Sequence, residues 1–163
     1  MPGWSAGKLD PRETVNRFCD LDLGGVRLDS THPGRSEFSA LLVKNGDWPE
    51  EPVRIVAAFR IVSVQSHGET ALVEVEYQSL GSLRGALESD HLVREDAPET
   101  VKFPLLRVHG SWRIKAFELP PHVSTEVLRK HVRSILDSDE KAGDSRRREV
   151  LQRLLVQLGS LDG

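Results

Sequence analysis

The hydrophobic period of this sequence changes twice along the chain, and these changes constrain its fold more than any other feature. Up to residue 45 the apolar residues recur at helical spacing, whereas from Val53 onward they alternate with polar residues as in a strand. After Pro121 the helical spacing returns. Helices grouped at both ends of the chain and strands grouped between them favour an α+β fold.

Two helices are predicted before the strands. The first covers residues 11–23, because Asp10 is a good cap and Pro11 suits the first helical position. Its apolar stripe consists of Val15, Phe18, Cys19, Leu23 and Val26. The second helix is predicted over residues 34–45, with Asn45 and Gly46 supplying a left-handed end.

The central strands are predicted over residues 53–64, 71–77, 101–108 and 111–118. The short turns at residues 66–68 and 109–110 leave no room for crossover helices, so the sheet is predicted to be antiparallel. The connector 81–100 is too long for a structureless loop in a compact domain. We expect residues 90–95 to extend a bent strand, and the rest to cover the sheet or close a cavity.

Two further helices are predicted in the C-terminal part. Ser124 caps the first, and a polar linker over residues 137–144 separates it from the second, which is predicted to end at Gly159. The second carries an apolar stripe of Val150, Leu151, Leu154, Leu155, Leu158 and Leu161. A short helix is marginal alone, so this stripe must be buried. It either folds back on its own sheet or reaches a second copy of the chain.

Composition narrows the class of protein. A chain of 163 residues fits one domain, and a net charge of −3 argues against a sequence-independent nucleic-acid binder. No run of 18 apolar residues occurs, so no membrane span is expected. The single cysteine excludes a disulfide within the chain. Because residues 1–8 lack a signal-peptide core, we expect a cytoplasmic protein, with an extracytoplasmic mature form lacking its leader as the alternative.

Two segments carry a resemblance to a known family. Residues 10–18, Asp-Pro-Arg-Glu-Thr-Val-Asn-Arg-Phe, and residues 103–114, which end in Gly-Ser-Trp-Arg-Ile, resemble the opening helix and final hairpin of the nuclear-transport-factor-2-like (NTF2-like) superfamily. That superfamily includes ketosteroid isomerase, scytalone dehydratase and SnoaL-type polyketide cyclases. The resemblance covers residues 10–119, leaving 1–9 as an N-terminal extension and 120–163 as a C-terminal helical extension.

The resemblance implies a cone, in which a curved antiparallel sheet wraps around the N-terminal helices. Enzymes of the superfamily place an acid, a base or a histidine inside the cone. No residue of this chain aligns with such a group, so no catalytic residue is carried over. Homodimers formed through the sheet are common in the superfamily, and a homodimer is therefore expected here.

Tyr77 and Asp22 are two candidate pocket residues. Tyr77 shares a strand face with Val73 and Val75, so its hydroxyl could point into the cone; a core tyrosine with its hydroxyl at a wet edge is the stronger interpretation. Asp22 could act as a general base if it is desolvated. A surface carboxylate beside Arg27 is the stronger interpretation of that residue.

Asp90 and His91 form the other candidate pair, an acid and a base adjacent in the long connector. Neighbours on a strand point to opposite faces, so only a loop conformation would let them cooperate. Cys19 lies on the apolar face of the first helix and is expected to be a small core residue. The histidines lack the spacing of metal ligands, so no metal and no cofactor are predicted.

Two functions remain open from the sequence. One is a non-catalytic module of the cone family that binds a small apolar ligand, or serves as a dimerisation or accessory module. The alternative is a small-molecule isomerase, dehydratase or cyclase that uses a carboxylate or histidine in the cone. A polar residue deep in an apolar cavity, with a shifted pKa, would favour the enzyme.

Overall fold

The structure is a computed structural model that describes residues 9–44, 49, 52–84, 91–115, 118–142 and 145–161. The described elements are four helices and six strands, in the order α1 (Pro11–Leu23), α2 (Arg35–Ala40), β1 (Val53–His67), β2 (Thr70–Arg84), β3 (His91–Arg94), β4 (Pro98–Val108), β5 (Ser111–Ile114), β6 (His122–Val123), α3 (Thr125–Ala142) and α4 (Ser145–Leu161). The predicted α+β class is confirmed.

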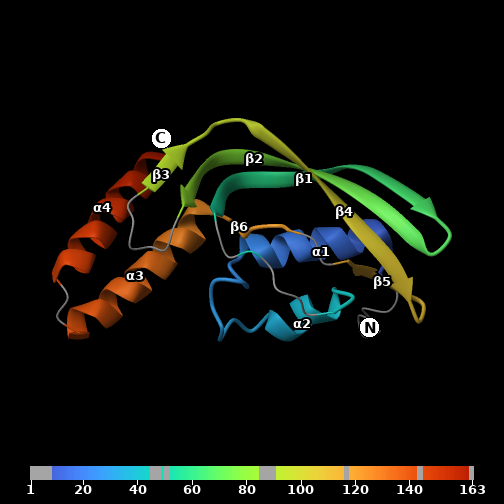
Figure 1. The fold of residues 1–163 in the computed structure, drawn as a ribbon, viewed down its shortest axis with the longest axis horizontal. Coiled ribbons are helices and arrows are strands. Elements are labelled where there is room, and N and C mark those ends of the chain that lie inside the picture. Colours follow the sequence, from blue (N-terminus) through green and yellow to red (C-terminus); the bar gives the residue numbers. More distant parts are fainter. Residues whose placement is uncertain are drawn as a thin grey trace, which may run out of the picture.

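The strands form one strongly curled sheet that arches over α1 (Figure 1). Its order is β5-β4-β2-β1-β6, and β3 pairs with the end of β2. Among the named strands that the structure describes, every pairing is antiparallel except that of β6 with β1, so the antiparallel prediction holds for the main strands. The register of β1 shifts at Ile55/Val56, Val56/Ala58 and Ile61/Ser63. Bulges of this kind bend a strand and increase its twist, in keeping with the curl of the sheet.

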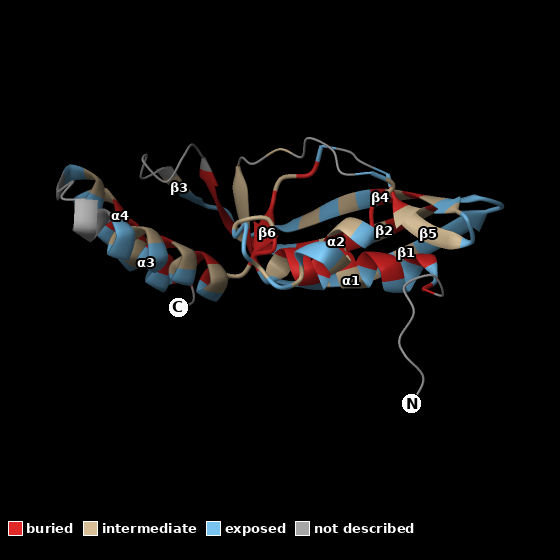
Figure 2. Ribbon diagram, turned by 90° about the horizontal axis from the view of Figure 1, so that it is seen from below, coloured by how far each residue is buried: buried red, intermediate tan, exposed pale blue. Residues whose placement is uncertain are grey.

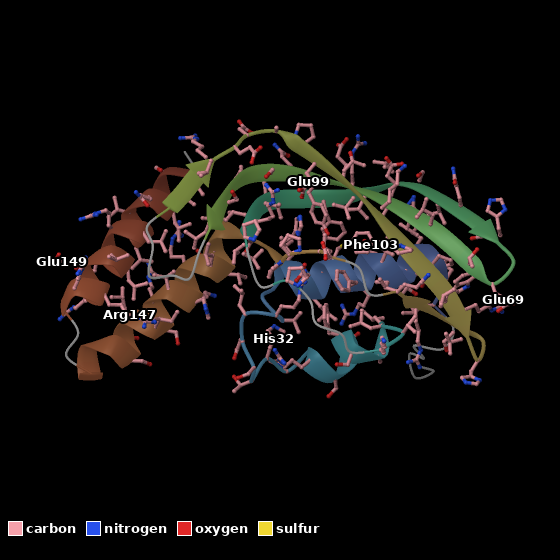
Figure 3. All side chains as sticks on the ribbon, viewed as in Figure 1. His32, Glu69, Glu99, Phe103, Arg147 and Glu149 are labelled. Atoms are coloured by element: carbon pink, nitrogen blue, oxygen red, sulfur yellow. The ribbon has the colours of Figure 1, made fainter. Side chains whose placement is uncertain are left out.

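The first core lies between the concave side of the sheet and α1, and we call it the α1 core. Alternate residues of β2 point into it, as the period of two predicts: Ala71, Val73, Val75 and Tyr77. Phe18 of α1 stacks on Phe38 at 4.8 Å between ring centroids and meets Phe103 edge-on at 5.4 Å. Figure 2 shows the buried stripe of α1, and Figure 3 shows Phe103 between β4 and α1.

The second core lies at the other end of the sheet, where α3 and α4 pack as a helical hairpin (Figure 1). We call it the hairpin core. Its fully buried members are apolar: Ile55, Leu83, Val123, Leu128, Val132, Leu151, Leu154 and Leu158. Because Ile55 and Leu83 belong to β1 and β2, the C-terminal stripe folds back on its own sheet, which was one of the two predicted alternatives.

The second predicted helix is too long. α2 ends at Ala40, because the next residues pair with β5 instead of continuing the helix. The Ile114 amide donates to the Leu41 carbonyl at 2.8 Å, and the Val43 amide donates to the Ile114 carbonyl at 2.9 Å. The predicted left-handed end at Asn45 and Gly46 lies outside the described residues.

The C-terminal predictions also need correction. The predicted polar linker 137–144 is wrong over most of its length, since α3 continues to Ala142. Its residues are polar but include no glycine or proline before Gly143, so nothing stops the helix there. α4 likewise runs past Gly159 to Leu161. Ser124 does cap α3, accepting from the Val127 amide at 3.1 Å.

The long connector is mostly sheet in its described part. β2 extends to Arg84, β3 covers part of the predicted strand 90–95, and β4 begins at Pro98. The last strand, predicted to reach residue 118, ends at Ile114. The parallel strand β6 was not predicted. None of the described helices is both long and apolar enough to cross a membrane.

Candidate functional site

An ion pair is buried where α1 ends. The Nε and Nη2 atoms of Arg27 lie 2.7 Å from the two carboxylate oxygens of Asp22, in a bidentate pair. The side chain of Asp22 is 1% exposed and that of Arg27 is 10% exposed. The predicted pairing with Arg27 is therefore confirmed, whereas the surface location expected for Asp22 is wrong.

The same ion pair holds the chain segment 119–122, which passes beside α1. Arg27 donates to the carbonyls of Leu119 at 2.6 Å and Pro120 at 3.0 Å. The His122 amide donates to Asp22 Oδ2 at 3.2 Å. This segment covers the ion pair, which explains why a carboxylate near a helix end is removed from solvent.

Both ring nitrogens of His122 face oxygen acceptors. Nδ1 lies 2.8 Å from the Pro120 carbonyl, and Nε2 lies 2.5 Å from Glu99 Oε1. A carbonyl and an ionised carboxylate only accept, so both contacts are hydrogen bonds when both nitrogens carry a proton. The residue is 1% exposed, so the ring is shielded from solvent and both of its nitrogens have a protein partner.

Glu99 is the member of the cluster nearest to solvent, with 28% of its side chain exposed. It lies at the start of β4, over α1 (Figure 3). The hydrogen bond from His122 lowers the pKa of Glu99, partial burial opposes that effect, and the charge of Arg54 at 3.6 Å adds to it. Glu99 is thus held as a carboxylate between the His122 ring and the cation of Arg54.

Tyr77 closes the cluster from the sheet side. Its ring stacks on that of His122 at 4.2 Å, and its hydroxyl lies 3.3 Å from the Cys19 sulfur. The residue is 1% exposed, so the expected placement of its hydroxyl at a wet edge is wrong. Burial raises the pKa of Tyr77 and of the Cys19 thiol, so both groups are neutral and either can donate in this contact. Cys19 is buried, as predicted.

The structure therefore brings two of the predicted residues, Tyr77 and Asp22, into one polar cluster. Asp90 lies outside the described residues, and His91 begins β3 with its side chain outside the described part. The predicted partnership of Asp90 with His91 accordingly stays a prediction.

Sequence reasoning missed two members of the cluster, Glu99 and His122. Glu99 lies directly opposite Tyr77 in the pairing of β4 with β2, so the two side chains share the concave face. That register could have identified it, had β4 been extended back to Pro98. His122 depends on the pairing of β6 with β1, for which two residues carry no periodic signal.

A separate feature lies outside the polar cluster. An open groove of about 340 Å³ is formed between α1 and β1. It is lined by Leu9, Arg12, Glu13, Asn16, Arg17 and Ile61. None of these residues is among the predicted pocket candidates, which were Tyr77, Asp22, Asp90 and His91. The groove mixes charged, amide and apolar groups, as ligand sites commonly do.

In the described part of the chain, no three His, Cys, Asp or Glu side chains gather as metal ligands. Comparison with protein-family models, with curated proteins and with solved structures returned no match.

Proposed function

We propose that this chain is an NTF2-like cone that serves as a binding module for a small ligand and not as an enzyme. The α+β order, the sheet that curls over α1 and the sequence resemblance of residues 10–18 and 103–114 support the family assignment. Because no relative matches, we infer the function from the chemistry of the residues themselves.

The observation that carries the proposal is the mutual satisfaction of the polar groups beneath the sheet. A general base needs a lone pair within hydrogen-bond reach of its substrate. Asp22 is occupied by Arg27 and by the His122 amide. His122 in turn bonds Pro120 and Glu99. These contacts suit a structural role for Asp22 and His122. A ligand would then bind at a surface outside this polar cluster.

An isomerase, dehydratase or cyclase is the second candidate, and one specific observation favours it. Glu99 is partly exposed and is hydrogen-bonded to a buried histidine, which is an arrangement seen in acid–base catalysis. In such an enzyme Glu99 would exchange a proton with substrate while His122 holds it in place. The short bond to His122 and the lowered pKa of Glu99 make it a weak base, which counts against this candidate.

One experiment separates the two candidates. The full chain would be incubated with steroids, aromatic polyketides and small carboxylates, with melting temperature and product formation both recorded. A binding module is stabilised by a ligand, by about 2.7 kcal/mol at a hundredfold excess over Kd, and leaves it unchanged. Conversion of any compound that is abolished in Glu99→Gln would establish the enzyme. Absence of stabilisation by the entire panel would contradict the binding function.

Homodimerisation stays a prediction. The apolar stripe of α4 is buried against its own chain, so it is not available to form a dimer interface. Light scattering on the full chain and on a chain lacking residues 145–163 tests it. We expect a full-length dimer whose truncated form loses stability, because truncation exposes Leu83 and Val123. A monomer at every concentration would refute the dimer.

A further inference from the structure

We propose that the groove between α1 and β1 binds a small carboxylate with an apolar body, and that Arg12 and Asn16 hold its carboxylate. The inference rests on the proposed binding function and specifies the site and the class of ligand. It places the ligand outside the polar cluster beneath the sheet.

The first support is a pair of unused donors. Arg12 and Asn16 lie four residues apart on α1, so their side chains share one face of the helix, and both line the groove. In the part of the chain that the structure describes, neither side chain has a hydrogen-bond or ion-pair partner. A guanidinium fork and an amide N–H one turn apart can both donate to the oxygens of one carboxylate.

The second support is the way in which the charged groups around the groove are paired. The other cation, Arg17, makes a bidentate pair with Glu37 of α2, at 2.6 and 2.8 Å. Glu13 is engaged in the capping box of α1, accepting from the Asp10 amide. Among the described groove residues, Arg12 is therefore the cation without an ion-pair partner, and its guanidinium can pair with an anion.

The backbone amides at the start of α1 are not the binding groups. The Asp10 carboxylate already accepts from the Glu13 amide at 2.7 Å, so the helix end carries its own cap. Recognition of the anion is thus assigned to side chains that face the groove, which makes it removable by substitution without uncapping the helix.

The third support is the apolar wall. Ile61 of β1 is half-buried beside the groove and offers carbon surface to a ligand, whereas Leu9, which also lines the groove, is buried. A volume of about 340 Å³ is at the small end of ligand sites, which run from roughly 300 to 1,000 Å³. This favours a compact molecule, such as octanoate or a substituted benzoate, over a steroid.

The test is a calorimetric titration of the full chain with octanoate, followed by NMR with amide and side-chain detection. We expect saturable binding, with the largest shifts at Arg12, Asn16 and Ile61. Arg12→Gln should weaken binding by about tenfold or more, as expected for loss of a charged hydrogen bond, and Asn16→Ala by a smaller factor. Octanol, which has no charge, should bind at least about tenfold more weakly than octanoate.

Arg133→Gln is the matched control, since Arg133 is an exposed arginine on α3, in the other half of the molecule, and should leave the affinity unchanged. Equal affinity of wild type and Arg12→Gln would overturn the inference. So would tighter binding of octyl phosphate than of octanoate, which would indicate a phosphate site. Shifts that map to Tyr77 and Glu99 would overturn the site while leaving the binding function intact. No binding of octanoate, together with stabilisation by a steroid, would do the same.

Discussion

The two cores of this molecule are built on the same strands yet differ in chemistry. The α1 core combines stacked aromatic rings with a polar cluster of Asp22, Arg27, Tyr77, Glu99 and His122. The hairpin core, at the other end of β1 and β2, is filled by leucine, isoleucine and valine. One sheet thus supports a core whose partners are fixed by hydrogen bonds and a core whose partners are fixed by shape alone.

The two cores differ in how strictly they fix the arrangement of the chain around them. Buried polar groups contribute favourably only when each finds its partner, so they select one arrangement of the chain. In the α1 core that arrangement is the path of residues 119–122 past the end of α1. Apolar packing is more tolerant of exchange, provided that volume is conserved. The hairpin core should therefore accept substitutions that the α1 core rejects.

The largest expected effect is on the buried ion pair. Asp22→Ala leaves the guanidinium of Arg27 buried without its counter-charge, and should cost roughly 3–5 kcal/mol of unfolding free energy. Replacing both partners by apolar residues, Asp22→Leu with Arg27→Met, removes the uncompensated charge and should recover part of that loss. The rest remains, because the Leu119 and Pro120 carbonyls and the His122 amide lose these hydrogen-bond partners. Urea denaturation of the two variants measures this.

Asp20→Ala is the control for this prediction, because Asp20 is an exposed carboxylate on the same helix and should change stability by less than about 0.5 kcal/mol. If Asp22→Ala costs no more than Asp20→Ala, the ion pair does not organise the α1 core.

The next effect belongs to the hairpin core. Leu154 is fully buried on α4, so Leu154→Ala should cost roughly 2–4 kcal/mol, whereas Leu154→Met should cost less than about 1.5 kcal/mol. Val156 on the same helix is 76% exposed, and Val156→Ala serves as the matched surface control. Thermal and urea unfolding of the three variants measure these costs. If Leu154→Met lowered the unfolding free energy more than Asp22→Ala does, the order expected for the two cores would be reversed.

A smaller effect, confined to acid, is expected at Glu99. The pKa of Glu99 is lowered in the folded state, chiefly by the hydrogen bond from His122, so its contribution is present above the unfolded pKa, near 4.5, and is lost as pH falls through the lower folded value. Glu99→Gln should cost roughly 1–2 kcal/mol at neutral pH, since the bond is charged but partly exposed.

The difference between wild type and Glu99→Gln should therefore shrink below about pH 4.5. Urea midpoints measured from neutral to acid pH give this difference directly. Leu154→Ala provides the contrast, because its deficit has no carboxylate origin and should stay nearly constant over the same range. A pH-independent deficit in Glu99→Gln would show that the Glu99–His122 pair does not stabilise the fold.

The sequence was sufficient for the elements with strong periodicity or caps. α1 matches its predicted bounds, because Asp10, Pro11 and the apolar stripe agree with one another. α2 did not match, since the residues after Ala40 pair with Ile114, a partner more than 70 positions away that no local pattern reveals. The same limit explains the missed β6.

The candidate site was less predictable than the fold. Tyr77 was placed on the concave face by strand alternation alone, and its burial follows. The burial of Asp22 did not follow, because a carboxylate near a helix end is ordinarily exposed and only the segment 119–122 covers it. The groove was not predicted, because it depends on Ile61 of β1 lying beside Arg12 and Asn16, which no local pattern reveals.

The protonation of the two His122 ring nitrogens distinguishes a structural cluster from a reactive one. A long-range proton–nitrogen NMR spectrum of the imidazole, recorded at about pH 6 and assigned with His122→Asn, reports the protonation of each ring nitrogen. If the cluster is structural, both nitrogens should carry a proton, with Nδ1 donating to the Pro120 carbonyl and Nε2 donating to Glu99. An Nε2 without a proton, offering its lone pair beneath the sheet, would contradict the structural role and favour the enzyme.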